Sequence, residues 1–412
     1  MKLIILTQYF PPEVGAPQNR LYEMAVRLQK LGVEIEVLTA MPNYPSMVIH
    51  KEYKGKWYVK EDMNGMRVHR VWIWVGKSKS ILPRLLNYFS FVFTSMWIGW
   101  FKLGKVDYLL CESPPLFLGI SALFLKRVKK AKLIFNVADL WPESAEKLGL
   151  ITNKSLLNIT TKLEEYLYKS SALIVGQAMG IVKNIQDRFP NKIVYWLPNG
   201  VDLTFYNPDT TTTRWREENG FSQDDFIILY AGIIGHAQAL ELVLKAANLT
   251  KDKPNIKWVL LGSGPEKEKL LAMQQQMQLT NVYFYPPVPK STMPGVLKAA
   301  DAALVPLQRI DLFLGIIPSK VFEAMAMKKP LLLGVEGESK ELFIEQGKAG
   351  LAFIPEDENN LVKNTLLLYN NRGDALQYGE NGRAYAEANF NRDTIAEKIL
   401  QFPEKCEVEL RT

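Results

Sequence analysis

Apolar runs and amphipathic stretches alternate along the first half of the chain. Apolar runs predict buried strands at residues 2–7, 33–40, 106–113, 131–139, 171–178 and 192–199, and the alternating segment 66–74 predicts another strand. Stretches with helical periodicity lie between them, among them QNRLYEMAVRLQKLG, which Gly32 closes. Buried strands that alternate with helices are typical of a parallel sheet with helices on both faces. We therefore predict a doubly wound α/β domain over residues 1–198.

The pattern changes near residue 199 and then repeats. Residues 199–225 are polar, rich in Thr, Asn and Asp and without periodicity, which predicts a linker. Apolar runs return at residues 226–232, 256–264, 281–288, 302–307 and 330–335. They predict a second doubly wound, Rossmann-like domain over residues 226–385, with residues 386–412 packing back on the first. A chain of 412 residues also exceeds the usual size of one hydrophobic core. Two such domains are expected to face each other across a cleft, where ligands bind.

Composition narrows the protein class. The chain is 48% hydrophobic and 23% charged, as in ordinary globular proteins. Its two cysteines, Cys111 and Cys406, cannot form a disulfide framework, and its three histidines form no HExxH pattern. These observations argue against a zinc enzyme. The first residues, MKLIILTQYF, lack the long apolar region of a signal peptide, so we expect a cytoplasmic protein.

Positive charge is concentrated in one segment, residues 70–132. Eleven Lys and Arg residues face only Asp107 and Glu112 there, a surplus larger than the +7 of the whole chain. The basic residues are Arg70, Lys77, Lys79, Arg84, Lys102, Lys105, Lys126, Arg127, Lys129, Lys130 and Lys132. Such a segment favours an anionic partner.

An uncharged apolar stretch, residues 85–101, lies inside this basic segment. Its sequence, LLNYFSFVFTSMWIGWF, is short of the roughly 20 apolar residues that a spanning helix needs. Three interpretations stay open: a core helix, a helix lying in a membrane interface, and a transmembrane span. Aromatic side chains flanked by cations suit the lipid headgroup region, so we favour peripheral membrane contact. The bulky apolar run fits nucleic acid poorly.

Two strand-to-helix loops contain glycines that could admit a ligand. In PPEVGAPQNR, Gly15 precedes a helix whose free N–H groups favour an anion, although a plain tight turn fits equally well. In LYAGIIGHAQAL, Gly232 and Gly235 flank the turn, and His236 could bond a sugar or phosphate or simply lie at the surface.

The segment IIPSKVFEAMAMKKPLLLG carries the strongest group of candidate residues. Ser319 is a good helix N-cap, Lys320 opens the helix and Glu323 follows in its first turn. Lys320 could neutralise a departing nucleoside diphosphate, and Glu323 could accept hydrogen bonds from ribose hydroxyls. The alternative is a capped helix with an ordinary Lys–Glu pair three residues apart.

A further candidate segment, NVADLWPES, follows a strand of the first domain. Asp139 could accept a hydrogen bond from an acceptor hydroxyl, or could cap the following helix. Trp141 could stack on a sugar ring. We place Glu13, Trp141 and Glu143 on the acceptor side.

Together these segments resemble a known family. The runs LTQYFPPEVGAPQNRLYEMA, AMPNYP, SPPLF, DLWPES, LPNGVD and IPSKVFEAMA resemble the WbuB-like members of glycosyltransferase family 4, in order from residue 3 to about residue 395. The resemblance implies the GT-B fold and a retaining, metal-independent glycosyltransferase without a cofactor. It also implies transfer of an amino- or deoxysugar, from UDP by analogy, to a saccharide on polyprenyl diphosphate. Such enzymes build O-antigen, lipopolysaccharide and other surface polysaccharides.

The resemblance also implies roles for individual residues. Gly15 matches a glycine loop facing the donor diphosphate, and Lys320 and Glu323 match residues expected at the diphosphate and the ribose. Asp139 matches an acidic residue at a sugar-contacting strand end, so Asp139 and Lys320 are the expected catalytic residues. No protein nucleophile is expected.

The chain also departs from the family pattern. Gly315 stands where the first of two paired glutamates is expected, residues 233–240 contain no cation, and Ala138 stands where relatives usually have Arg. Two alternatives therefore stay open: a nucleotide-sugar 2-epimerase and a catalytically degenerate scaffold of a polysaccharide assembly complex.

Overall fold

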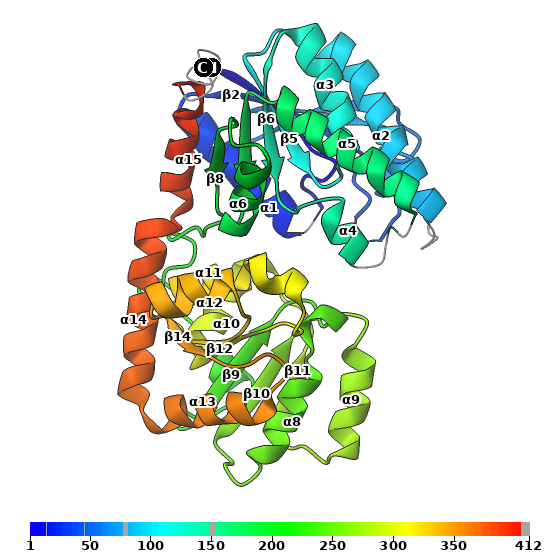
Figure 1. Ribbon diagram of the computed structural model, residues 1–412. Helices are drawn as coiled ribbons and strands as arrows, with labels where there is room; N and C mark the ends of the chain where they lie inside the picture. Colours follow the sequence, from blue (N-terminus) through cyan, green and yellow to red (C-terminus); the bar gives the residue numbers. More distant parts are fainter. Residues whose placement is uncertain (14, 45, 77–80, 148–150, 152, 405–412) are drawn as a thin grey trace. The chain divides into compact units, whose positions relative to one another are not determined.

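The computed structural model describes residues 1–13, 15–44, 46–76, 81–147, 151 and 153–404. The chain divides into two compact units (Figure 1). Unit 1 comprises Met1–Asn199 and the C-terminal segment that begins at Arg392, and unit 2 comprises Gly200–Asn391. The C-terminal return to unit 1 therefore starts six residues later than we predict from the sequence.

Unit 1 is built on an eight-stranded sheet of order β3-β4-β2-β1-β5-β6-β7-β8, parallel except for the β3–β4 pair. Its strands are β1 (Lys2–Leu6), β2 (Glu34–Ala40), β3 (Tyr58–Met63), β4 (Met66–Val71), β5 (Tyr108–Ser113), β6 (Lys132–Val137), β7 (Leu173–Gly176) and β8 (Val194–Trp196). Every residue of β5 is buried, as expected for a central strand covered on both faces. The predicted doubly wound architecture is confirmed.

Helices cover both faces of this sheet (Figure 1). They are α1 (Ala16–Lys30), α2 (Ile81–Lys102), α3 (Leu118–Lys129), α4 (Glu143–Lys147), α5 (Lys154–Ser170), α6 (Met179–Arg188) and α15 (Arg392–Leu400). The apolar sides of α1 and α15 share one core cluster with β1, β2 and β4. On the opposite face α2 packs on α3, which contacts α5.

The edge hairpin β3–β4 corrects the sequence prediction, which contained no strand at residues 58–63. β3 is half exposed and mixes charged with apolar residues, so it lacks the apolar run of a buried strand. The turn Asn64-Gly65 has positive φ at both residues, 53° and 80°. That dipeptide is a strong hairpin signal, and it was available in the sequence.

Unit 2 contains an all-parallel sheet of order β11-β10-β9-β12-β13-β14. Its strands are β9 (Phe226–Ala231), β10 (Ile256–Leu261), β11 (Val282–Tyr285), β12 (Ala302–Pro306), β13 (Leu331–Gly334) and β14 (Gly350–Ala352), the last not predicted. Its helices are α7 (Trp215–Glu218), α8 (Glu241–Leu249), α9 (Lys267–Gln276), α10 (Met293–Ala299), α11 (Lys320–Ala326), α12 (Glu338–Lys340), α13 (Glu358–Asn370) and α14 (Arg372–Asn389).

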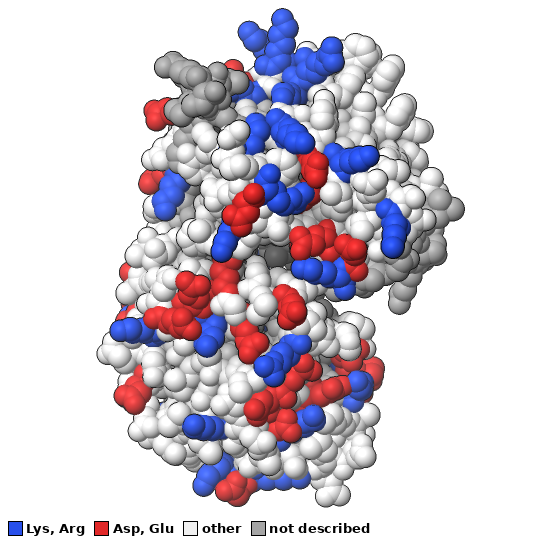
Figure 2. Space-filling view, in the orientation of Figure 1, with Lys and Arg blue, Asp and Glu red and all other residues white. Residues whose placement is uncertain are grey.

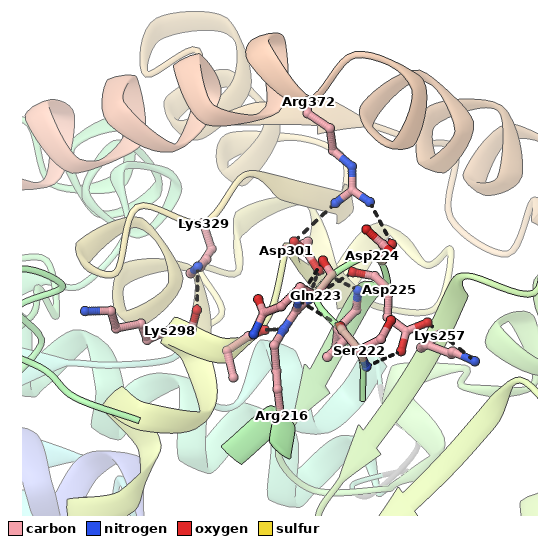
Figure 3. A network of polar contacts seen from close by, with 12 residues as sticks. Arg216, Ser222, Gln223, Asp224, Asp225, Lys257, Lys298, Asp301, Lys329 and Arg372 are labelled. Atoms are coloured by element: carbon pink, nitrogen blue, oxygen red, sulfur yellow. Dashed lines mark hydrogen bonds and ion pairs between the residues drawn. The ribbon is translucent and has the colours of Figure 1, made fainter. Parts of the chain in front are cut away.

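The segment 199–225, predicted as a linker, is bound tightly to unit 2 from residue 200 onward. Arg216 donates to the carbonyl oxygens of Ala299 and Asp225 and pairs with Asp301 at 2.5 Å (Figure 3). Asp301 also pairs with Arg372 of α14 at 3.2 Å. This polar network makes the segment part of the unit rather than a free connection, and the sequence pattern could not show that because the partners are distant in the chain.

Helix α2 buries several polar side chains and exposes an apolar face, the opposite of a usual surface helix. Its polar side chains point inward: Asn87 accepts a hydrogen bond from Gln8 at 2.8 Å, Thr94 donates to the Trp72 carbonyl at 2.7 Å, and Ser95 donates to Ser121 of α3 at 2.8 Å. Its exposed face is apolar, with Leu86, Phe89, Phe93, Trp97, Trp100 and Phe101. Phe93 is 68% exposed and Phe101 60%. Residues 85–101 are therefore not a fully buried core helix.

Among the residues that the structure describes, no helix is both long enough and apolar enough to cross a membrane.

Part of the basic segment is internal rather than displayed at the surface. Arg70 is fully buried and pairs with Glu61. Lys126 donates to the Ser170 carbonyl, and Lys129 donates to the carbonyls of Trp100 and Leu103. Lys77 and Lys79 lie outside the described residues. The surface charge is therefore smaller than the sequence count suggests.

Candidate functional site

In unit 2 the loops that follow β9 and β10 pack closely against each other at glycine residues, and we call this contact the glycine crossing. Gly232, directly after β9, has φ +149° and packs against Gly262, where an added Cβ would lie 1.9 Å from the Gly232 oxygen. Gly264 is equally close to the Ile234 oxygen, at 2.2 Å. Only glycines allow the two loops to approach this closely. The sequence prediction included Gly232 and missed Gly262 and Gly264, although the run GSG after a predicted strand was a usable signal.

Lys320, at the start of α11, lies beside this crossing. Its ammonium is 3.8 Å from the centroid of the Tyr230 ring, and the Cβ position of Gly232 would be 3.1 Å from its Nζ. Burial lowers the pKa of Lys320 to about 7, and the carboxylate of Glu323 opposes that shift. A half-buried ammonium held by an aromatic face and one nearby carboxylate is suited to receive an anion.

Glu323 and Lys320 line one pocket in unit 2, whose empty space, including open solvent, is about 290 Å³. The remaining lining is apolar and comes from β9, α10, β12 and α11: Leu229, Ala231, Met293, Leu297, Ala303, Leu304, Val305 and Ala324. The structure thus brings together three predicted residues, Gly232, Lys320 and Glu323, and adds Tyr230. The contact between Tyr230 of β9 and Lys320 of α11 joins segments far apart in the chain, so the sequence pattern did not reveal it.

The structure does not place the other predicted residues of unit 2, Ser319, His236 and Gly235, in the lining of this pocket. The prediction of a Ser319 side-chain cap is wrong: Ser319 itself has helical angles, φ −59° and ψ −28°, and its side chain makes no capping bond. His236 lies 3.2 Å from Gln308, nitrogen to nitrogen. Gly235 has negative φ, and a Cβ there would meet mainly the flexible side chain of Gln238, so a glycine is not required at this position.

In unit 1, the predicted residues 139, 141 and 143 lie at the carboxyl end of β6. The carboxylate of Asp139 accepts a hydrogen bond from the Ser144 hydroxyl at 2.5 Å, which ties it to α4. The ring of Trp141 packs edge-on against Phe117, with centroids 5.6 Å apart. Glu143 pairs with Lys147 at 2.7 Å on the exposed side of α4.

Glu13 has a different environment from the one we expect for an acceptor contact. It is 2% exposed, and its carboxylate accepts hydrogen bonds from the backbone N–H groups of Asn43, Tyr44 and Phe10 at 2.7–3.2 Å. Burial raises its pKa and these hydrogen bonds lower it. Its carboxylate therefore holds the loop after β1 against the loop after β2.

Gly15 directly precedes α1 and has φ 179°, an extended angle open to any residue. An added Cβ would lie 2.4 Å from Oε1 of Gln18, the end of a flexible side chain. The need for glycine at this position is therefore modest.

A buried polar group in unit 1 was not predicted. Glu112 of β5, 3% exposed, pairs with Arg20 of α1 and accepts a hydrogen bond from the Asn136 side chain at 2.5 Å. Burial raises the pKa of Glu112, and the Arg20 charge lowers it. From the sequence, Glu112 counted only as one of two acidic residues in the basic segment 70–132. Its buried contacts could not be predicted because Arg20 and Asn136 lie on other elements.

The described residues contain no cluster of three or more His, Cys, Asp or Glu side chains able to hold a metal ion.

Comparison with known proteins identifies both halves of the chain. Residues 15–200 match the family described as glycosyl transferase 4-like domain, and residues 211–385 match the family described as glycosyl transferases group 1. A curated relative, the putative colanic acid biosynthesis glycosyl transferase WcaI of Escherichia coli K12, is 26% identical over 97% of this chain and 99% of its own length.

Solved structures share the same fold over nearly the whole chain. Sucrose-phosphate synthase from Thermosynechococcus elongatus superposes with a TM-score of 0.76 and 16% identity, covering 99% of each chain. Anabaena HepE in complex with UDP and glucose gives 0.72 and 15% identity over 98% of this chain and 99% of its own. The two parallel α/β units thus form the GT-B fold, as the sequence resemblance implies.

Proposed function

Because this chain belongs to the glycosyltransferases, with a glycosyl transferase 4-like domain followed by a group 1 domain, we propose that it transfers a sugar from a nucleoside diphosphate to a lipid-linked saccharide in surface polysaccharide synthesis. The observation that carries the proposal is the convergence of Lys320 and Glu323 at one cavity, with Gly232 beside the Lys320 ammonium. UDP is the proposed nucleotide, supported by the UDP bound to the structurally similar HepE.

Lys320 would act on the leaving group. Its ammonium stabilises the charge that develops on the departing diphosphate, and the cavity carboxylate of Glu323 accepts hydrogen bonds from the ribose. The acceptor hydroxyl attacks from the face that the diphosphate leaves, so the anomeric configuration is retained. The step uses no protein nucleophile and no metal, and Asp139 and Trp141 contact the acceptor sugar.

The surface-polysaccharide part of the proposal rests on a relative. The putative colanic acid glycosyl transferase WcaI matches this chain over nearly its full length. The acceptor we propose is a saccharide on polyprenyl diphosphate, and the transferred sugar is an amino- or deoxysugar.

Membrane contact of unit 1 belongs to the same proposal. Helix α2 buries the uncharged polar side chains of Asn87, Thr94 and Ser95. It exposes Phe93, Trp97 and Phe101, an apolar surface that is favourable in contact with apolar surroundings. Basic side chains cluster near α3 in unit 1 (Figure 2), and Lys102 of α2 and Arg127 of α3 are exposed. Cations beside exposed aromatics suit an anionic lipid headgroup layer. We therefore propose a cytoplasmic protein held peripherally at the inner face of the plasma membrane.

Nucleotide binding provides the test of the transferase proposal. Thermal unfolding of the purified protein, without metal, is measured with UDP, GDP and TDP and their sugars. A ligand at 100 times its dissociation constant adds about 2.7 kcal/mol to the free energy of unfolding. We expect one nucleotide to raise the melting temperature and the rise to be lost in Lys320→Ala and Glu323→Gln. Lys340→Ala, which changes a half-exposed lysine of α12, is the matched control. Absence of any shift would favour a degenerate scaffold.

Vesicle binding tests the membrane contact separately. Sedimentation with vesicles of neutral and anionic phospholipid should show binding that increases with anionic content and falls several-fold in Trp97→Ala and Phe101→Ala. Ile159→Ala, which removes an exposed apolar side chain from α5, is the control. Binding that depends on neither lipid charge nor these aromatics would contradict the proposal.

A further inference from the structure

A second pocket lies in unit 1 and contains none of the residues assigned above to the nucleotide or the acceptor. Its empty space, including open solvent, is about 400 Å³. It is lined by residues of α1, β6, the segment after β8 and α15: Arg20, Leu21, Met24, Asn136, Leu197, Pro198, Asn199, Arg392, Ile395 and Ala396. All of them belong to unit 1, and Asn199 and Arg392 are the residues at which the chain leaves and re-enters this unit.

The walls of this pocket are mostly apolar. Leu21, Leu197 and Ile395 belong to the core cluster that α1 and α15 share, and Met24 packs against that cluster. The polar groups are the side chains of two arginines and two asparagines. Apolar walls with a few polar groups are the usual form of a small-molecule site.

One polar group of the lining is a buried oxygen without a partner. Asn136 is 2% exposed, and its side-chain N–H donates to the Glu112 carboxylate at 2.5 Å. Its Oδ1 accepts no hydrogen bond from any residue that the structure describes. A buried acceptor left in this state destabilises the protein, and a bound group that supplies a donor removes the penalty.

Arg20 supplies the complementary group. Its guanidinium has five N–H donors, and within the described parts of the chain its hydrogen-bond partner is Glu112, reached through Nη2. Glu112 bonds both Arg20 and Asn136, so the remaining donors of Arg20 and the oxygen of Asn136 belong to the same end of the pocket. A hydroxyl group can accept from Arg20 and donate to Asn136 at once.

The charges around the pocket are already paired. Arg392 pairs with Glu23 of α1 and donates to the Asn199 carbonyl and Oδ1 at 3.3 and 3.1 Å. Each of the two guanidinium groups therefore has a carboxylate, Glu112 for Arg20 and Glu23 for Arg392. A charged ligand would lose water here without gaining an unpaired counter-ion, whereas a neutral hydroxyl compound avoids that cost.

We propose that this pocket is a binding site for a small, uncharged polyhydroxyl compound, a free monosaccharide or a cyclic polyol of similar size. Its hydroxyl groups bond Arg20 and Asn136, and its C–H groups pack on Leu21 and Ile395. The site is separate from the residues proposed for the donor and the acceptor, and the inference does not rest on the proposed function.

Free sugars and polyols provide the test with the full-length protein. Dissociation constants are measured by NMR titration for glucose, galactose, mannose, rhamnose, myo-inositol, glucuronic acid and glucosamine. We expect at least one neutral compound to bind, and the charged glucuronic acid and glucosamine to bind about tenfold more weakly than it does. The affinity should be the same in Lys320→Ala. A sugar whose binding is lost in Lys320→Ala occupies the nucleotide-sugar site and overturns the inference.

Variants of the lining connect the binding to the pocket. Asn136→Ala should weaken it about tenfold, because one hydrogen bond is lost. Met24→Trp, which places a larger ring in the pocket from a half-buried position, should abolish it even if Asn136→Ala does not fold. Asn281→Ala is the matched control, since Asn281 of unit 2 is also buried with an unpartnered Oδ1.

Two further results would overturn the inference. Binding of none of the probes would mean that the pocket holds only water. Unchanged affinity in the folded Asn136→Ala and Met24→Trp proteins would place the sugar elsewhere. Both results leave the transferase proposal standing, because nucleotide binding tests that proposal separately.

Discussion

Buried charged side chains near the strand ends have several polar partners in unit 1 and few in unit 2. In unit 1 two buried carboxylates have several polar partners, although burial still raises the pKa of each: Glu13 accepts three backbone N–H groups, and Glu112 pairs with Arg20 and accepts a hydrogen bond from Asn136. In unit 2 the half-buried ammonium of Lys320 has an aromatic face at 3.8 Å, and the Glu323 carboxylate offsets only part of the effect of burial on its pKa. A buried charge with several polar partners holds loops together, whereas a buried charge with few partners is available for a ligand. Three measurements test this difference between the two units.

The largest effect is expected at Glu112. Glu112→Ala leaves the Arg20 guanidinium buried without its carboxylate, which should lower the free energy of unfolding by about 3–5 kcal/mol. The melting temperature should then fall by about 10 °C. Glu165→Ala, which breaks an exposed pair with Lys169 on α5, should change the free energy by less than about 1 kcal/mol. Calorimetric scanning measures both, and equal small effects would mean that Glu112 is not a structural charge.

The next effect is expected at Lys320 and has the opposite sign for stability. Lys320→Met removes a poorly compensated charge, so the ligand-free protein should gain about 1 kcal/mol and melt about 2–4 °C higher. Affinity for the nucleotide sugar should fall by about 30–100-fold, because a charge-assisted hydrogen bond is lost. Lys340→Met should change neither quantity. A destabilised Lys320→Met protein would make Lys320 a structural residue like Glu112.

The smallest effect is a pH dependence of binding. Only the cationic form of Lys320 attracts a diphosphate, and its pKa in the free protein is about 7. Binding raises that pKa, so affinity should be constant below pH 7 and fall above it by up to tenfold per pH unit. UDP-glucose is the suitable probe because its diphosphate does not titrate in this range. A flat profile, or one unchanged in Lys320→Met, would contradict the role of the ammonium.

The sequence predicted the parallel core of both units well because buried strands produce continuous apolar runs. It failed at β3 and β14, where an exposed edge strand and a three-residue strand leave no such run. For the site, local motifs were sufficient to select Lys320 and Glu323, which lie three residues apart. Tyr230 and the glycine crossing were missed, since they become neighbours only when β9, β10 and α11 assemble.

Glu13 illustrates a different limit of sequence interpretation. An acidic residue in a loop beside a glycine fits both a ligand contact and a loop anchor, and only its three backbone donors distinguish them. The same applies to Ser319, a residue type favoured at helix N-caps that here adopts helical angles without capping. Residue type restricts the possible roles, and the backbone around the residue selects one.

The late return of the chain to unit 1 has a consequence for biosynthesis. Unit 2 is contiguous, residues 200–391, so all of it has been synthesised before the last helix emerges from the ribosome. Unit 1 is completed only when α15 brings Ile395, Ile399 and Phe402 to the core beside α1. During translation the apolar side of α1 must therefore stay uncovered while the whole of unit 2 is made. Unit 1 therefore completes its hydrophobic core only after unit 2 has been synthesised. Until then the exposed apolar side of α1 is a surface to which chaperones can bind.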